Sequence, residues 1–173
     1  MIQRHCGFHS LPSRRTLGRR LKFFSPSVRK QIRALGRTLI VNGIANTKVN
    51  AVDKSMIKAQ GPLWHTKDRK KGIVPVHLRN VDRDSDWGYS RYRGWVQGYA
   101  IHLLCSATPG FVTVPLDADA ATANVPENRI FESMIDHLHN DTKYIVADSG
   151  YDDRKLTEKC EFRKNNKHIP VAL

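Results

Sequence analysis

The N-terminal quarter of the chain repeats apolar residues three or four positions apart, which is typical of amphipathic helices. The first stripe consists of Leu17, Leu21 and Phe24, and the second of Val28, Ile32, Leu35 and Leu39. Ser13 is a suitable N-cap, Ser25-Pro26 is expected to separate two helices, and Asn42-Gly43 to end the second. Two short helices of this kind are typical of the end of a helix-turn-helix, with residues 14–24 as the recognition helix. They are equally typical of a helical hairpin that packs on a main domain.

From residue 47 onward the pattern becomes that of strands and longer helices. Strands are expected at 49–53, 95–105, 111–116, 144–147 and 168–173, and helices near 126–138 and 153–164. The buried face of the first of these helices is predicted to consist of Ile130, Phe131, Met134, Ile135 and Leu138. Residues 58–93 are polar and basic and look like an insertion. The order of elements predicts a mixed α/β domain with three antiparallel strands followed by crossover units, over residues 46–173, after a basic helical segment over 1–45.

Charge is distributed unevenly along this pattern. The net charge is +13, yet no Asp or Glu precedes Asp53, and 11 of the 29 basic residues lie in that acid-free stretch. Because unbalanced positive charge is relieved by a polyanion, DNA or RNA is the expected partner, and a merely solvated basic face is the alternative. The stretch has no one-sided Trp/Phe face of the kind that membrane-surface helices use.

Two basic clusters are candidates for DNA contact. The first consists of Arg14, Arg15, Arg19, Arg20 and Lys22, and the second of Lys67, Arg69, Lys70 and Lys71 around Trp64. Cations around an exposed aromatic ring suit phosphate contact and base stacking. A structural loop with Trp64 packed inward is the alternative interpretation.

Two acids stand where predicted strands end. The run Tyr144–Ala147 stops at Asp148, followed by Ser149 and Gly150, and the upstream strand ends at Asp53. A carboxylate at the end of a buried strand lies at the rim of a sheet, where it can hold a divalent metal or act as acid and base. The alternative for Asp148 is a turn residue that caps the next helix.

The remaining composition excludes several classes of protein. Cys6, Cys105 and Cys160 are odd in number and widely spaced, which favours reduced thiols in the cytoplasm, and no zinc pattern is present. No apolar run approaches the roughly 20 residues of a transmembrane helix, and the N-terminus lacks the apolar core of a secretory signal.

Four stretches together resemble one known family. They are VDKSMIKAQGPLWHTKDRKKGIVP from Val52, WGYSRYRGWVQGYAIHLL from Trp87, VPLDADAATANVPEN from Val114 and VADSGYDD from Val146. In this order they resemble insertion-element DDE transposases of the IS-four type, whose catalytic domain is ribonuclease H-like. Lys54 and Ala100 depart from the family, which often has a small residue and a Lys at these positions.

The resemblance implies a specific chemistry. Asp53 corresponds to the first catalytic acid and Asp148 to the second, and a complete site would hold two Mg²⁺ or Mn²⁺ ions for cleavage and transfer of DNA strands. The family's third acid, a Glu on a later helix, has no counterpart. Glu158 and Glu161, the only glutamates after Asp148, are expected to face solvent.

The expected protein is therefore a transposase that is incomplete at its C-terminus and inactive alone. The alternatives are a non-catalytic DNA-binding remnant and a ribonuclease H-type nuclease. Element ends are the expected DNA partner, a homodimer on that DNA is the expected assembly, and the nucleoid of a bacterial cytoplasm is the expected location.

Overall fold

The computed structural model describes residues 14–78, 80–162 and 171–172, and side chains between residues 26 and 161. The helices are α2 (Arg14–Val41), α3 (Thr66–Lys70), α4 (Glu127–Ile135), η1 (Ser149–Tyr151, a 3₁₀ turn) and α5 (Arg154–Phe162). The strands are β1 (Val49–Lys58), β2 (Asp86–Ser90), β3 (Gly94–Ser106), β4 (Pro115–Thr122), β5 (Tyr144–Val146) and β6 (Val171–Ala172).

All six described strands form one mixed sheet. β3 pairs antiparallel with β1 and with β4, while β2 pairs with the first residues of β3. β5 runs parallel to β1, and β6 runs parallel to β5. Two parallel crossovers follow the antiparallel strands, as the order of elements predicts, but β2 adds a fourth antiparallel strand to the expected three. The expected mixed α/β class is confirmed.

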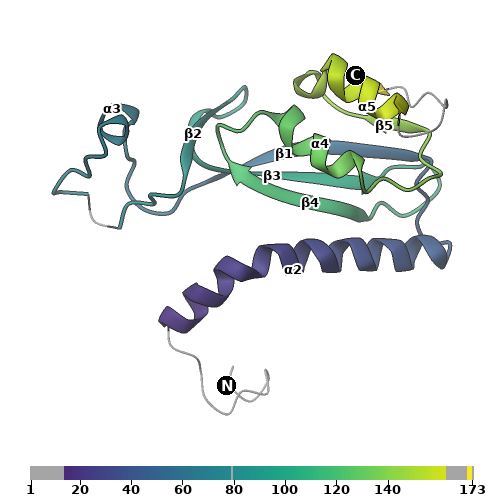
Figure 1. The fold of residues 1–173 in the computed structure, drawn as a ribbon, viewed down its shortest axis with the longest axis horizontal. Coiled ribbons are helices and arrows are strands. Elements are labelled where there is room, and N and C mark those ends of the chain that lie inside the picture. The colour runs from purple at the N-terminus through teal and green to yellow at the C-terminus, as the bar shows by residue number, and fades with distance from the viewer. Residues whose placement is uncertain (1–13, 79, 163–170, 173) are drawn as a thin grey trace, which may run out of the picture.

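The main core lies between the sheet and helices α4 and α5, which stack over it in Figure 1. Phe131, Met134, Ile135 and Leu138 are buried, and Ile130 packs against them, which confirms the predicted apolar face of α4. Each of these large side chains contributes roughly 1.5–3 kcal/mol when fully buried, so this cluster fixes α4 on the sheet.

The N-terminal segment differs from the expectation. Residues 14–41 form one continuous helix with Pro26 inside it, so the predicted break at Ser25-Pro26 is wrong. A proline within a helix removes one backbone hydrogen bond and bends the axis without necessarily ending it, and α2 bends in its N-terminal half in Figure 1. The predicted end at Asn42-Gly43 is confirmed, because Gly43 adopts a φ of 70° and its N–H donates to the carbonyl of Ile40.

The face that α2 turns to the sheet matches the predicted stripe only in part. Val28, Ile32 and Leu39 are half-buried. Leu35 is 65% exposed, whereas Gly36 is buried against β4. A Cβ at Gly36 would lie 3.1 Å from the carbonyl oxygen of Pro115, so the absence of a side chain permits the close approach. Arg33 and Arg29 lie one and two turns earlier on the same face and form ion pairs with Asp117 of β4. Two cations of the acid-free stretch are therefore neutralised inside the protein.

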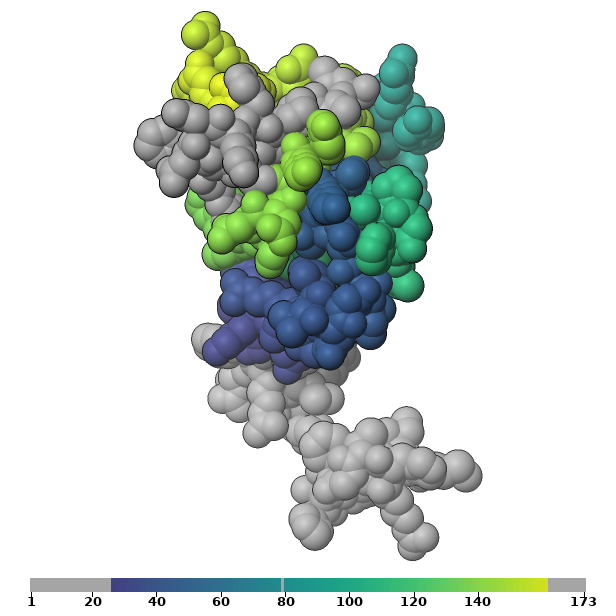
Figure 2. Space-filling model, turned by 90° about the vertical axis from the view of Figure 1, so that its right-hand side faces the viewer, coloured from purple at the N-terminus to yellow at the C-terminus, as the bar shows by residue number. Residues whose placement is uncertain are grey.

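Three connections meet at one end of the sheet. In Figure 2 the blue α2–β1 connection lies beside the green β3–β4 turn and the lime segment before β5. Thr108 donates its hydroxyl to the carbonyl of Asn46 at 2.9 Å, and Lys143 donates its backbone N–H to the carbonyl of Lys48 at 2.8 Å. These bonds set the start of β1 relative to β5, and hence the register on which the candidate site depends.

Two further strand boundaries were mispredicted. β4 covers residues 115–122 and not 111–116, because the ladder with β3 pairs Tyr99 to Cys105 with that later segment. The segment at 58–93 contains α3, far from the sheet in Figure 1, but it returns to the sheet as β2. Part of the expected insertion is therefore a strand of the sheet itself.

Candidate metal and DNA site

Asp53 and Asp148 lie at the same level of neighbouring parallel strands. Every β1 residue in the ladder pairs with the β5 residue 95 positions later, from Val49 with Tyr144 to Ala51 with Val146. Asp148 lies 95 positions after Asp53, and its backbone is still extended. Both residues are exposed, and continuing this register by two residues would pair them and put both on one face of the sheet.

The prediction that Asp53 ends its strand is wrong. β1 continues five residues further, to Lys58, because the long β3 offers it pairing partners from Ser106 to Gly98. Asp53 is therefore a mid-strand residue, paired with Leu103 of β3 and with further β3 pairs before and after it. Asp148 does follow the end of β5, as predicted, with Ala147 between them.

Asp148 also caps the turn that follows it. Its Oδ1 accepts the backbone N–H of Gly150 at 3.1 Å, so the alternative of a capping residue describes a real contact. An ionised carboxylate offers about four lone-pair sites, and one capping bond leaves most of them available. The cap fixes the orientation of the side chain without excluding a metal ligand.

Tyr151 and His102 form a buried polar contact beneath this turn. The Tyr151 hydroxyl lies 3.2 Å from Nδ1 of His102, and both residues are almost fully buried. Burial raises the pKa of Tyr151, and the carboxylates of Glu127, Asp148 and Asp53 raise it further. Burial lowers the pKa of His102, and the ammonium of Lys54 lowers it too, against the opposing effect of Glu127. Tyr151 therefore lies under the combined field of three carboxylates and stays a neutral phenol.

Glu127 is the residue near this site that sequence reasoning missed. It starts α4 and forms an ion pair with Lys54 of β1, and both side chains are less than one-fifth exposed. A Cβ at Gly150 would collide with the Glu127 carboxylate and lie 3.2 Å from Oδ1 of Asp148. The Glu127–Lys54 pair thus occupies the space beside the Asp148 turn. The position of Lys54, next to Asp53, was the available signal.

The donor set fits a divalent metal in type but falls short in number. Carboxylate oxygens are the ligands that Mg²⁺ prefers, and Asp53 and Asp148 provide two carboxylates on one face. Within residues 26–78 and 80–161, however, no group of three or more His, Cys, Asp or Glu side chains is placed to hold an ion. Glu127 does not complete such a group, and Lys54 already balances its charge.

The predicted DNA contacts divide into three sets. Arg14, Arg15, Arg19, Arg20 and Lys22 lie on α2, but their side chains are outside the described part of the structure. Lys67, Lys70 and Lys71 are exposed on and after α3. Trp64 and Arg69, in contrast, face inward.

Trp64 is only 7% exposed, so the structure has the inward-packed arrangement that the sequence left open. Its indole Nε1 donates to the carbonyl of Ile73 at 2.8 Å, and its own carbonyl accepts from the indole of Trp87. The Arg69 guanidinium lies 5.7 Å from the Trp64 ring and pairs with Asp86 at 3.4 Å. These contacts hold together the segment around α3, between Trp64 and Trp87, and the buried ring is not placed to stack on a base.

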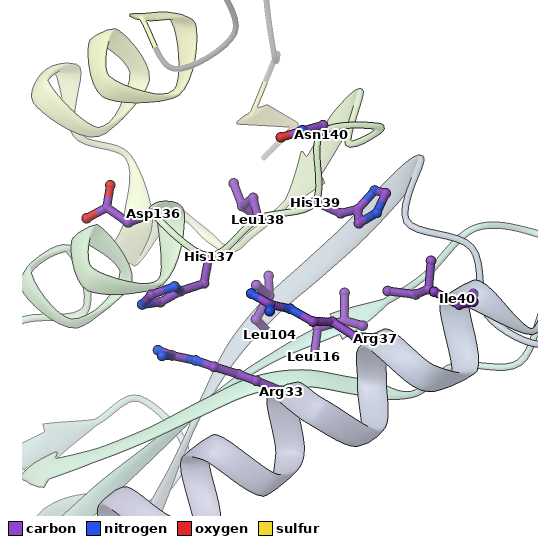
Figure 3. Close-up of a pocket in the computed structure, with 11 residues that line it drawn as sticks. Arg33, Arg37, Ile40, Leu104, Leu116, Asp136, His137, Leu138, His139 and Asn140 are labelled. Carbon is purple, nitrogen blue, oxygen red and sulfur yellow. The ribbon is translucent and has the colours of Figure 1, made fainter.

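A separate cavity of about 370 Å³ lies between α2 and the segment after α4. Figure 3 shows Arg33 and Arg37 of α2 pointing toward His137 and His139 across it. Burial lowers the pKa of His137, and the charge of Arg33 lowers it further. Neither Asp53 nor Asp148 lines this cavity, so it is not part of the carboxylate site.

Comparison with known proteins gives one match. The model of a family described as "Transposase DDE domain" matches residues 44–171, which is most of the chain. Neither the curated proteins nor the solved structures provide a match. In the described parts of the chain, no helix combines the length and apolar character needed to cross a membrane.

Proposed function

The chain belongs to the transposase DDE domain family, and from this membership we propose that it binds DNA and holds a divalent metal ion at Asp53 and Asp148. The observation that supports the proposal is the parallel register of β1 and β5 in a ribonuclease H-like sheet, which pairs Asp53 with Asp148 when it is continued by two residues. When bound, Mg²⁺ or Mn²⁺ supplies Lewis-acid activation and charge stabilisation for displacement at a phosphate. The protein contributes the position of the ligands: the ladder fixes Asp53, and the bond to Gly150 fixes Asp148.

Two carboxylates make a weak site. With no third ligand among the described residues, the ion is expected to keep several waters, and strand cleavage by this chain alone is expected to be slow or absent. Titration with Mn²⁺ alone tests the ligands. Asp53→Asn and Asp148→Asn should each weaken binding clearly, while Asp141→Asn, a change at a carboxylate 75% exposed after α4, should not. Unchanged Mn²⁺ affinity in both site variants would contradict the assignment.

Cleavage of duplex DNA in the presence of Mg²⁺ tests the chemistry directly. We expect little product from the wild-type chain, because the ligand set is incomplete. Robust cleavage that is lost in Asp148→Asn would show that the two carboxylates suffice, and would overturn the expectation of low activity.

The DNA-binding part of the proposal rests on charge. The net charge is +13, Lys67, Lys70 and Lys71 are exposed on and after α3, and α2 carries further basic residues. If about six phosphates are contacted, affinity for duplex DNA should fall roughly 10³-fold between 50 and 200 mM salt. An affinity that hardly changes over this range would refute an electrostatic interface.

A second candidate is a DNA-binding module without chemistry. It is favoured by the lack of a three-ligand group among the described residues. It predicts DNA affinity that survives Asp53→Asn and Asp148→Asn together, with no metal dependence. A ribonuclease H-type nuclease is less well supported, because the additional carboxylate beside Asp148 is Glu127, which pairs with Lys54. The insertion-element subtype, a homodimer on DNA and a nucleoid location stay predictions from the sequence.

A further inference from the structure

The β2–β3 hairpin ends in a tip of exposed aromatic and basic side chains that lies outside the Asp53–Asp148 site. We define the tip as residues 89–95. Tyr89 is 61% exposed, Tyr92 is 96% exposed and Trp95 is 69% exposed, and Arg91 and Arg93 are exposed between them. Clustered aromatic rings with this much exposure are unusual on a protein surface and mark an interaction site.

The tip has a defined shape. Ser90 pairs with Gly94 at the end of the ladder, and the three residues between them form a tight loop. Gly94 has a φ of 69°, the left-handed conformation that such three-residue loops require. Arg93 donates from Nη1 to the carbonyl of Met56 at 3.1 Å, which ties the loop to β1. The tip is therefore presented in a set conformation, and binding to it costs little ordering.

Tyr89 and Trp95 face each other across the two strands. Their ring centroids are 5.6 Å apart with an interplanar angle of 68°, an edge-to-face contact. Such a pair stabilises a hairpin, but that role does not require the rings to stay largely exposed. In an edge-to-face pair only one ring face is used, so aromatic surface remains open for another planar group.

An open groove of about 420 Å³ runs from these rings to the Glu127–Lys54 pair and Gly150, in the turn that Asp148 caps. Tyr89 and Trp95 line one part of it, and Lys54, Glu127 and Gly150 line another. Gly150 is the residue whose N–H donates to Asp148. The volume is within the range of small-ligand pockets.

We propose that this tip and groove bind an unpaired nucleobase of a DNA strand beside the Asp53–Asp148 site, an inference that rests on the proposed DNA-binding function. The faces of Tyr89 and Trp95 stack on the base, and Arg91 and Arg93 contact the flanking phosphates. The alternation of aromatic rings with arginines favours a single strand of nucleic acid, which offers a π-face and a negative charge at every nucleotide.

Binding of the full chain to three DNAs tests the inference. The DNAs are a blunt duplex, the same duplex with a short single-stranded overhang, and that overhang with abasic sites in place of its bases. At one fixed salt concentration, the overhang with bases should bind about 5- to 150-fold more tightly than the abasic one, as expected for one stacked base. Trp95→Ala should abolish this preference and Trp95→Phe should retain most of it, while both bind the blunt duplex as the wild type does.

Phe111→Ala is the matched control, since Phe111 is 46% exposed in the β3–β4 turn, beyond the other end of β3. It should leave the preference unchanged. A wild-type protein that binds the blunt duplex but does not distinguish bases from abasic sites would overturn this inference alone, even if Trp95→Ala failed to fold. A preference that persists in folded Trp95→Ala would overturn it too. Failure to bind any of the three DNAs would overturn the proposed function as well.

Discussion

The hydroxyl of Tyr151 is hydrogen-bonded to Nδ1 of His102 at 3.2 Å, between the turn that follows Asp148 and the central strand β3. The other ring nitrogen of His102, Nε2, is buried and has no hydrogen-bond partner within the described part of the chain. The Tyr151 contact is therefore the one that this structure gives the buried imidazole. It also anchors η1, whose N-cap is Asp148.

Tyr151→Phe should lower the free energy of unfolding by about 1–3 kcal/mol, because it leaves both nitrogens of a buried imidazole unsatisfied. Urea denaturation measures the change. Tyr144→Phe is the control, since Tyr144 is 49% exposed on β5 and its change should fall within about 0.5 kcal/mol. Equal effects of the two variants would show that the Tyr151–His102 bond contributes nothing.

The attachment of α2 to the sheet is tested at Asp117. This carboxylate is 1% exposed and accepts from Arg29 and Arg33 at 2.8–2.9 Å. Asp117→Asn should cost about 2–3 kcal/mol, less than a fully buried pair because both guanidinium groups reach water. Asp119→Asn, at a partly exposed partner of Arg29, should cost roughly 0.5–1 kcal/mol. Limited proteolysis within α2 should increase in Asp117→Asn and much less in Asp119→Asn.

The same cluster predicts a loss of stability in acid. Burial alone would raise the pKa of Asp117, but the hydrogen bonds from Arg29 and Arg33 outweigh it and lower the pKa. A carboxyl whose pKa is lower in the folded state contributes stability above its unfolded pKa of about 3.9, and that contribution disappears as pH falls through the folded value. Unfolding free energies measured from pH 5 to pH 2.5 should therefore fall less steeply in Asp117→Asn than in the wild type. Asp141→Asn should keep the wild-type slope.

These relationships show what the sequence could and could not predict. The strands other than β2 and the buried face of α4 follow from local periodicity, whereas β2 was interpreted as part of an insertion. The stripe of α2 could not be predicted in the same way, because Arg29 and Arg33 face inward only to meet Asp117, some 85 residues later. Apolar spacing carries no information about a partner so distant in the chain.

In the candidate site, too, local sequence patterns could be predicted and features that depend on distant parts of the chain could not. Asp148 could be predicted, since an apolar run that stops at an acid is a local pattern, although Tyr144 and Val146 of that run are 49% and 43% exposed. The place of Asp53 within β1 depends on the length of β3, and the approach of Glu127 to Gly150 depends on how α4 packs. The aromatic tip was visible as alternating rings and arginines in YSRYRGW, but only the structure shows that Trp95 is exposed while Trp64 is buried.

A substitution at Gly150 tests how closely Glu127 approaches the turn that Asp148 caps. Gly150→Ala should cost about 1–3 kcal/mol, because the new Cβ collides with the Glu127 carboxylate while Lys54 holds that group in place. The same substitution in a Glu127→Ala background should cost clearly less. This double-mutant cycle isolates the contact between the two positions. An identical cost in both backgrounds would mean that Glu127 is not the group that Gly150 accommodates.

Substitutions at Trp64 and Lys70 distinguish a structural role from DNA contact in the segment around α3. Trp64→Ala removes a buried ring and its hydrogen bond to the carbonyl of Ile73, so it should lower the free energy of unfolding by about 3–5 kcal/mol. Lys70→Ala removes an exposed cation and should leave stability within about 0.5 kcal/mol, while duplex DNA affinity falls and its salt dependence becomes shallower. Thermal melting and binding at two salt concentrations measure both effects on the same samples. If Trp64→Ala kept full stability but lost affinity, the ring would be a DNA contact after all, and the inward packing would not reflect its role.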